Sequence, residues 1–210
     1  MPRIDWQTAL KGLAGFIVAV VIWVGVSPLY DRAVAAGAEL LMRTFESPKV
    51  THLTATGTDV KVDRSDFDPR SPRPGLPVID LTFNWVLLAA LFAINPRPFS
   101  DRNMLRFAIA SLLMYVTHIL ALATEVMSIY VLRLGAWSRV HYGAFARNFW
   151  GTANHSYRFV LMFAIAFGLW WALRPTTLTR PPATLSRSRG RGSEEPSRST
   201  RKASRRRARS

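Results

Sequence analysis

Four long apolar runs dominate the pattern of hydrophobic and polar positions along the chain. They cover residues 13–29, 76–94, 104–132 and 157–173. A helix needs about 20 mainly apolar residues to cross the hydrocarbon core of a bilayer. Runs of this length are therefore typical of membrane-spanning helices, whereas the helices of soluble domains alternate apolar and polar positions. The pattern predicts an all-α polytopic membrane protein with four transmembrane helices.

The stretch between the first two runs has a mixed pattern. Residues 30–47 have apolar positions at helical spacing, which predicts a helix on the membrane surface or packed on a neighbouring domain. In residues 49–63 polar and apolar residues alternate around Thr-Gly-Thr-Asp, which predicts a β-hairpin. The prolines of residues 64–77 predict an extended connector. We expect a small extracytoplasmic insertion made of a helix and a hairpin.

These patterns divide the chain into four parts. They are the N-terminus with the first transmembrane helix (1–29), the extracytoplasmic loop (30–76), a three-helix membrane region (77–173) and a basic tail (174–210). The tail is rich in Ser, Pro and Arg and has too few apolar residues to build a core, so we expect it to be disordered. The fourth run is short for a span, and we expect it to extend into the preceding loop.

The first run permits two interpretations. A cleaved signal peptide has a basic start, a short apolar region and a small-residue site, for which Ala33-Val34-Ala35 qualifies. However, Asp31 and Arg32 crowd that site and the apolar region is long, so an uncleaved first span is favoured. Pro28 is expected to break or kink this helix near its end.

Charge and cysteine content narrow the possible functions. The net charge is +15, with much of the basic excess in the tail, and the chain has no cysteine. The absence of cysteine excludes disulfides, thiolate catalysis and thiolate metal sites. Arginines that follow a membrane span are attracted to anionic lipid. We therefore predict lipid-surface binding, rather than specific nucleic-acid binding, by four tail residues: Arg205, Arg206, Arg207 and Arg209.

Polar residues inside the second and third runs form the candidate site. Asp80 and Asn84 are four residues apart, and His118 and Glu125 are seven apart, so each pair shares one helix face. Antiparallel packing of the two helices predicts that all four lie at similar depth as an intramembrane polar cluster. Such a cluster serves either a functional cavity or hydrogen bonding between helices, and the structural role is favoured. The sequence assigns no catalytic residue, metal or cofactor.

Two stretches carry a resemblance to a known family. The first span ends in the pattern Trp23…Pro28-Leu29-Tyr30, and the second span contains Leu-Thr-Phe-Asn-Trp-Val-Leu-Leu at 81–88. With the short exported hairpin, this layout over residues 10–173 resembles the four-span membrane proteins associated with bacterial exosortases, such as the exosortase H-associated membrane protein. The resemblance implies an accessory role in sorting exported proteins at the inner membrane. An exosortase itself needs a catalytic Cys, which this chain lacks.

Three functions remain open from the sequence. The first is a non-catalytic integral membrane accessory protein of an export or sorting system, with membrane lipids and a membrane peptidase or sorting protein as partners. The second is a small transporter or lipid-handling subunit that uses Asp80, His118 and Glu125 as a polar pathway. The third is a membrane enzyme with a carboxylate and histidine site at the outer face. We favour the first.

The charge distribution predicts the topology. Basic residues near the ends of spans favour the cytoplasmic side, and the basic residues of loop 30–76 are balanced by acids, so both termini are expected to be cytoplasmic. A reporter fused at Asp59 is therefore expected to show an extracytoplasmic location in an activity assay. A cytoplasmic signal from that fusion would contradict the topology.

Overall fold

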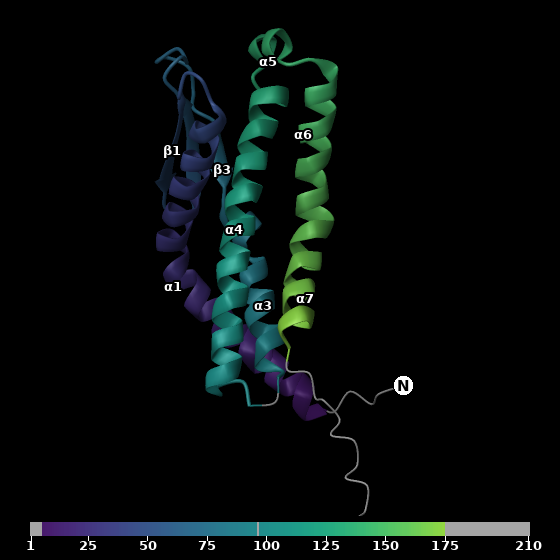
Figure 1. Cartoon of the computed structure of the whole chain (residues 1–210). Helices are drawn as coiled ribbons and strands as arrows, with labels where there is room; N and C mark the ends of the chain where they lie inside the picture. The colour runs from purple at the N-terminus through teal and green to yellow at the C-terminus, as the bar shows by residue number, and fades with distance from the viewer. Residues whose placement is uncertain (1–5, 96, 175–210) are drawn as a thin grey trace, which may run out of the picture. The chain divides into compact units, whose positions relative to one another are not determined.

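The computed structural model describes residues 6–95 and 97–174, and the predicted tail with its lipid-binding arginines lies outside these residues. The described chain is mostly helical with one small sheet (Figure 1). Its elements, in chain order, are α1 (Trp6–Phe45), β1 (Thr51–Thr56), β2 (Asp59–Arg64), β3 (Gly75–Pro77), α2 (Ile79–Thr82), α3 (Asn84–Ala93), α4 (Asp101–Leu132), α5 (Ala136–His141), α6 (Ala144–Ser156), the π-helical turn η1 (Tyr157–Leu161) and α7 (Met162–Leu173).

Three helices are long and apolar enough to cross a membrane. They are α1, α4 and the continuous helix Ala144–Leu173 that α6, η1 and α7 form together. Most of their apolar side chains are exposed, as expected for surfaces that face lipid tails. The last helix begins well before the fourth apolar run, as the shortness of that run predicts. The prediction of a helical membrane protein is thus confirmed in outline.

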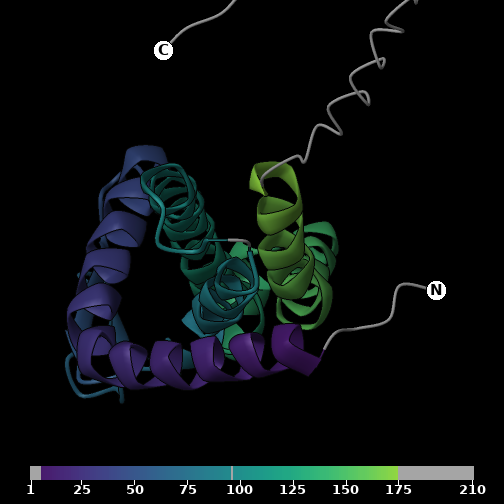
Figure 2. The same cartoon turned by 90° about the horizontal axis from the view of Figure 1, so that it is seen from below.

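The second apolar run does not form a membrane-length helix. It is divided at Phe83 into α2 and α3, and residues 79–93 would extend only about 22 Å at 1.5 Å per residue. No residue of α3 is exposed. The helix contacts α1, α4 and α7, and Figure 2 shows it enclosed among them. A helix that is apolar on all sides is suited to lipid or to a protein core, and α3 lies in a protein core.

Helix α1 continues through Pro28 without interruption to Phe45. Figure 2 shows that it changes direction along its length, where its colour passes from purple to blue. Proline removes one backbone hydrogen bond and its ring displaces the preceding turn, which bends a helix. The result is therefore a kink rather than a break. The first half of α1 carries most of its exposed apolar residues, and the second half packs against the sheet.

The sheet has the order β1-β2-β3 with antiparallel neighbours. Its inward side chains pack with the second half of α1 and the C-terminal half of α4 in one core. The inward residues are Leu53, Val60, Val62 and Leu76. The opposite face is polar and exposed, with His52, Thr54 and Lys61. Strand β3 lies within the predicted connector, where an edge position tolerates Pro77.

Side chains close the free edge of β1. The backbone N–H of Thr51 donates to Glu46 at 3.0 Å, and that of Leu53 donates to Glu39 at 2.9 Å. Both carboxylates come from α1 or its end. Exposed backbone edges of a sheet invite pairing with other chains. Here helix α1 supplies the missing hydrogen-bond acceptors, so the edge of the sheet is attached to the helix.

Arg64, the last residue of β2, holds that end of the strand against neighbouring elements. Its guanidinium donates to both carboxylate oxygens of Asp66, at 2.9 and 3.0 Å, and lies 4.9 Å from the ring centre of Tyr130 and 5.1 Å from that of Trp137. The hydrogen bond from Arg64 lowers the pKa of the Asp66 carboxyl. A cation over aromatic faces is stabilising. Arg64 therefore joins the sheet to α4 and α5.

Two glycines of α1 test the packing of α1 on α3. A Cβ added at Gly15 would lie 2.3 Å from Cβ of Ala93, whereas one at Gly25 would meet nothing within 4 Å. Gly15→Ala is expected to destabilise the protein by about 1–3 kcal/mol, because the two helices must separate. Gly25→Ala, the matched control, is expected to leave stability unchanged or to raise it slightly. Thermal unfolding in detergent measures both variants, and equal melting temperatures for the two would contradict the close approach.

Candidate functional site

A chain of hydrogen bonds connects four helices through buried polar side chains. The hydroxyl of Tyr30 on α1 lies 2.7 Å from Nδ1 of His118 on α4. Nε2 of His118 lies 2.7 Å from Oδ1 of Asn84 on α3. Nδ2 of Asn84 then donates to the backbone carbonyl of Met162, the first residue of α7, at 3.0 Å. We call this series the Tyr30–His118–Asn84 chain.

The order of donors and acceptors in this chain fits a neutral His118 imidazole. If Tyr30 donates to Nδ1, then Nε2 carries the proton and donates to Asn84, whose amide donates onward to Met162. His118 is completely buried and Asn84 nearly so. Each polar group thus has a partner without help from water. This arrangement is well suited to holding helices together in an apolar environment.

Glu125 belongs to a separate ion pair. Its carboxylate is buried and receives a hydrogen bond from Nε of Arg158 on η1 at 3.1 Å. Nη2 of Arg133 lies 3.7 Å from the other carboxylate oxygen and is mostly exposed. The pair joins α4 to the long C-terminal helix, about two helical turns along α4 from His118 of the Tyr30–His118–Asn84 chain. Its charges are balanced within the fold.

The predicted four-residue cluster is therefore divided in the structure. Asn84 and His118 lie in direct contact, while Glu125 pairs with arginines instead. Asp80 is exposed on α2 and lies outside the buried chain. The prediction placed Asp80 and Asn84 on one face of a continuous helix, but the helix is interrupted at Phe83 between them.

Sequence reasoning missed two residues of α1. Tyr30 starts the hydrogen-bond chain, and Asp31 is 0% exposed although it carries a carboxyl group. The hydroxyl of Thr82 lies near Asp31 but donates to the backbone carbonyl of Val78, so neither oxygen of Asp31 has a hydrogen-bond partner among the described residues. The feature of the sequence that could have indicated them is a Tyr-Asp pair directly after an apolar run. The sequence places both residues in the helix predicted for 30–47, beyond the first span.

A groove opens between α1, α4 and α6, with a volume of about 740 Å³. We call it the lateral groove. Its floor is α4 from Leu120 to Met127, and most of its lining is apolar. The full lining is Leu41, Met42, Phe45, Glu46, Ser47, Pro48, Val50, Arg64, Leu120, Ala123, Thr124, Met127, Tyr142 and Trp150. Burial raises the pKa of the hydroxyl of Tyr142, one of these lining residues.

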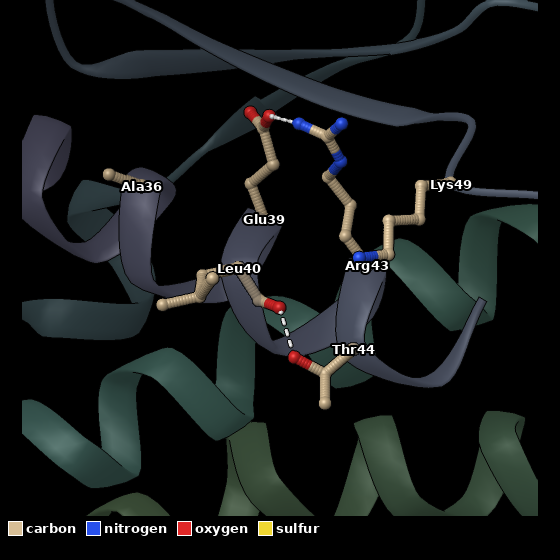
Figure 3. Close-up of a pocket in the computed structure, with 6 residues that line it drawn as sticks. All are labelled: Ala36, Glu39, Leu40, Arg43, Thr44 and Lys49. Carbon is tan, nitrogen blue, oxygen red and sulfur yellow. Dashed lines mark hydrogen bonds and ion pairs between the residues drawn. The ribbon is translucent and has the colours of Figure 1, made fainter.

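A second, shallower depression lies on the second half of α1 (Figure 3). Glu39 there is paired with Arg43 at 3.2 Å and also accepts the backbone N–H of Leu53. The hydroxyl of Thr44 donates to the carbonyl of Leu40. Because these polar groups serve contacts within the fold, the depression presents few free groups to a ligand.

Comparisons with known proteins give no family for the chain. No family model, curated protein or solved structure matches it. Within residues 6–95 and 97–174, no three or more His, Cys, Asp or Glu side chains are grouped so that they could hold a metal ion.

The buried ion pair makes a prediction for stability. Arg158→Gln leaves the Glu125 carboxylate buried with only a distant exposed partner, and is expected to cost about 3–5 kcal/mol of unfolding free energy. The double variant Glu125→Gln/Arg158→Gln removes both charges and is expected to cost much less. Arg133→Gln is the matched control and is expected to have a small effect. Chemical unfolding in detergent measures all three, and a double variant as unstable as Arg158→Gln would contradict the pairing.

Proposed function

We propose that the chain is a non-catalytic integral membrane accessory protein that holds a polar docking face beside the membrane for a partner in a protein export or sorting system. The observation that carries this proposal is the core that the sheet shares with α1 and α4. Two membrane-length helices support the sheet, so its polar face is fixed relative to the membrane. A sheet held rigidly in this way is suited to docking a partner protein rather than to converting a substrate.

The buried polar groups support the same proposal. The Tyr30–His118–Asn84 chain is satisfied within the fold, and Glu125 is paired with Arg158. Ionisable residues that form a pathway across a membrane face a common water-filled cavity or bundle interior. These residues instead serve contacts between helices. This favours the accessory role over a polar transport pathway through Asp80, His118 and Glu125, which are not gathered in one place.

The expected location follows from the charge pattern and the family resemblance. We propose a multi-pass protein of the bacterial inner membrane with both termini cytoplasmic and the sheet outside, in which α2 and α3 return the chain through the protein core between the spans α1 and α4. The partner class is a membrane peptidase of the sortase type or another sorting protein. The exposed face of the sheet, with His52 and Lys61, is the proposed contact surface.

Site-directed crosslinking in native membranes tests the proposal. The chain has no cysteine, so one engineered cysteine is a unique attachment point for a photoreactive maleimide. His52→Cys is expected to capture a membrane peptidase or sorting protein. Leu113→Cys, on the exposed apolar face of α4, is the control and is expected to capture lipid but not that protein.

Two results would overturn the proposal. One is a His52→Cys variant that captures no more protein than Leu113→Cys. The other is a transport or proton-flux phenotype that Glu125→Gln abolishes while the protein still folds. The second result would support the transporter alternative.

A further inference from the structure

One face of α4 passes from an exposed surface into the lateral groove. The exposed apolar residues on this face recur every three or four positions, which places them in one row along the helix. They are Leu105, Ile109, Leu112, Val116 and Leu120. Ala123 and Met127 continue the same spacing and form the floor of the groove. The groove is therefore an extension of the apolar surface that α4 presents to lipid.

Side chains from α1, α6 and the sheet line the groove around this floor. Leu41 and Phe45 of α1 form one wall, and Trp150 of α6 forms the other. Glu46, Arg64 and Tyr142 also line the groove, and Arg64 lies over Tyr130, beyond the end of the floor at Met127. An apolar chain can thus enter sideways from the bilayer at Leu120. Its polar headgroup would then meet the polar side chains near Arg64.

We propose that the lateral groove binds one acyl chain of a membrane phospholipid, with the headgroup directed toward Glu46 and Arg64. The groove floor from Leu120 to Met127 is about 10 Å long at 1.5 Å per residue. The first part of an acyl chain fills this length, and the remainder follows the row on α4 back into the bilayer. Burial of the chain's apolar surface supplies the binding free energy.

The size of the groove favours an acyl chain over a helix from another protein. Its volume of about 740 Å³ lies in the usual range for small-molecule sites. A membrane-spanning helix about 10 Å wide and 30 Å long occupies roughly 2,400 Å³. The groove could enclose only a fraction of such a helix.

The charges around Arg64 favour a zwitterionic headgroup. Glu46 and Arg64 lie 3.6 Å apart, and Arg64 also donates to Asp66. Two carboxylates thus face the one guanidinium, so this end of the groove carries a net negative charge and gives no unpaired positive charge to an anionic headgroup. The ammonium of a phosphoethanolamine group is attracted to this negative charge, whereas a headgroup with a net negative charge is repelled by it.

Photolabelling of the full chain in lipid nanodiscs tests the site. The nanodiscs contain phosphatidylethanolamine and phosphatidylglycerol, with a trace of phosphatidylethanolamine that carries a diazirine on its acyl chain. Peptide mapping is expected to find adducts within 120–127 and at Trp150, as well as along 105–116. Ala123→Phe fills the floor and is expected to lower the groove adducts about tenfold while leaving those at 105–116 unchanged.

Two further variants keep the test decisive. Leu113→Phe, also on the exposed face of α4 but outside the groove, is expected to change neither set of adducts. Thr124→Phe replaces Ala123→Phe if the latter does not fold. Wild-type adducts confined to 105–116, or groove adducts that both filling variants leave intact, would overturn the proposal. A peptide or a second copy of the chain found in the groove by native mass spectrometry would also overturn it. Equal groove labelling by a phosphatidylglycerol probe would overturn the headgroup assignment.

Discussion

The arrangement of the helices depends on hydrogen bonds between polar side chains buried among apolar ones, because a buried polar group without a partner, as Asp31 is here, costs free energy. Tyr30, His118 and Asn84 meet this requirement through one another and through the carbonyl of Met162. Each link comes from a different helix, so the hydrogen bonds fix the relative positions of α1, α4, α3 and α7. Lipid tails give apolar helices little reason to prefer one another. The polar chain supplies a specific arrangement that apolar surface alone would leave undefined.

This arrangement relates the membrane helices to the rest of the molecule. Above the polar chain, α1 bends past Pro28 and runs beside α4, and the sheet packs on both helices in a common core. Arg64 holds the sheet onto Tyr130 and Trp137. The consequence is a rigid polar face next to the lipid-facing surface, with a groove where the two surfaces meet. Docking of a partner and binding of a lipid chain are both consistent with this geometry.

The sequence predicted the parts of the fold that depend on length and composition. Apolar runs predicted the long helices, and alternation around Gly57 predicted strands where the sheet lies. Hydropathy did not distinguish α3 from a membrane span, because a protein core and lipid tails are equally apolar. Asp80 was misplaced because the interruption at Phe83 has no proline or glycine to indicate it. Tyr30 and Asp31 were missed because the bend of α1 determines what they contact.

The most direct measurement of the central claim is the stability of Tyr30→Phe in a native-like bilayer or detergent. The substitution removes only the hydroxyl and keeps the ring contacts with Trp23 and Tyr115. It leaves Nδ1 of His118 buried without its partner, which is expected to cost about 1–3 kcal/mol of unfolding free energy. Tyr115→Phe is the companion variant. The hydroxyl of Tyr115 donates to the carbonyl of Ala33 at an exposed position, so its loss is expected to cost less. A Tyr30→Phe protein as stable as the wild type, or more stable, would contradict the claim that this hydrogen-bond chain holds the helices in place.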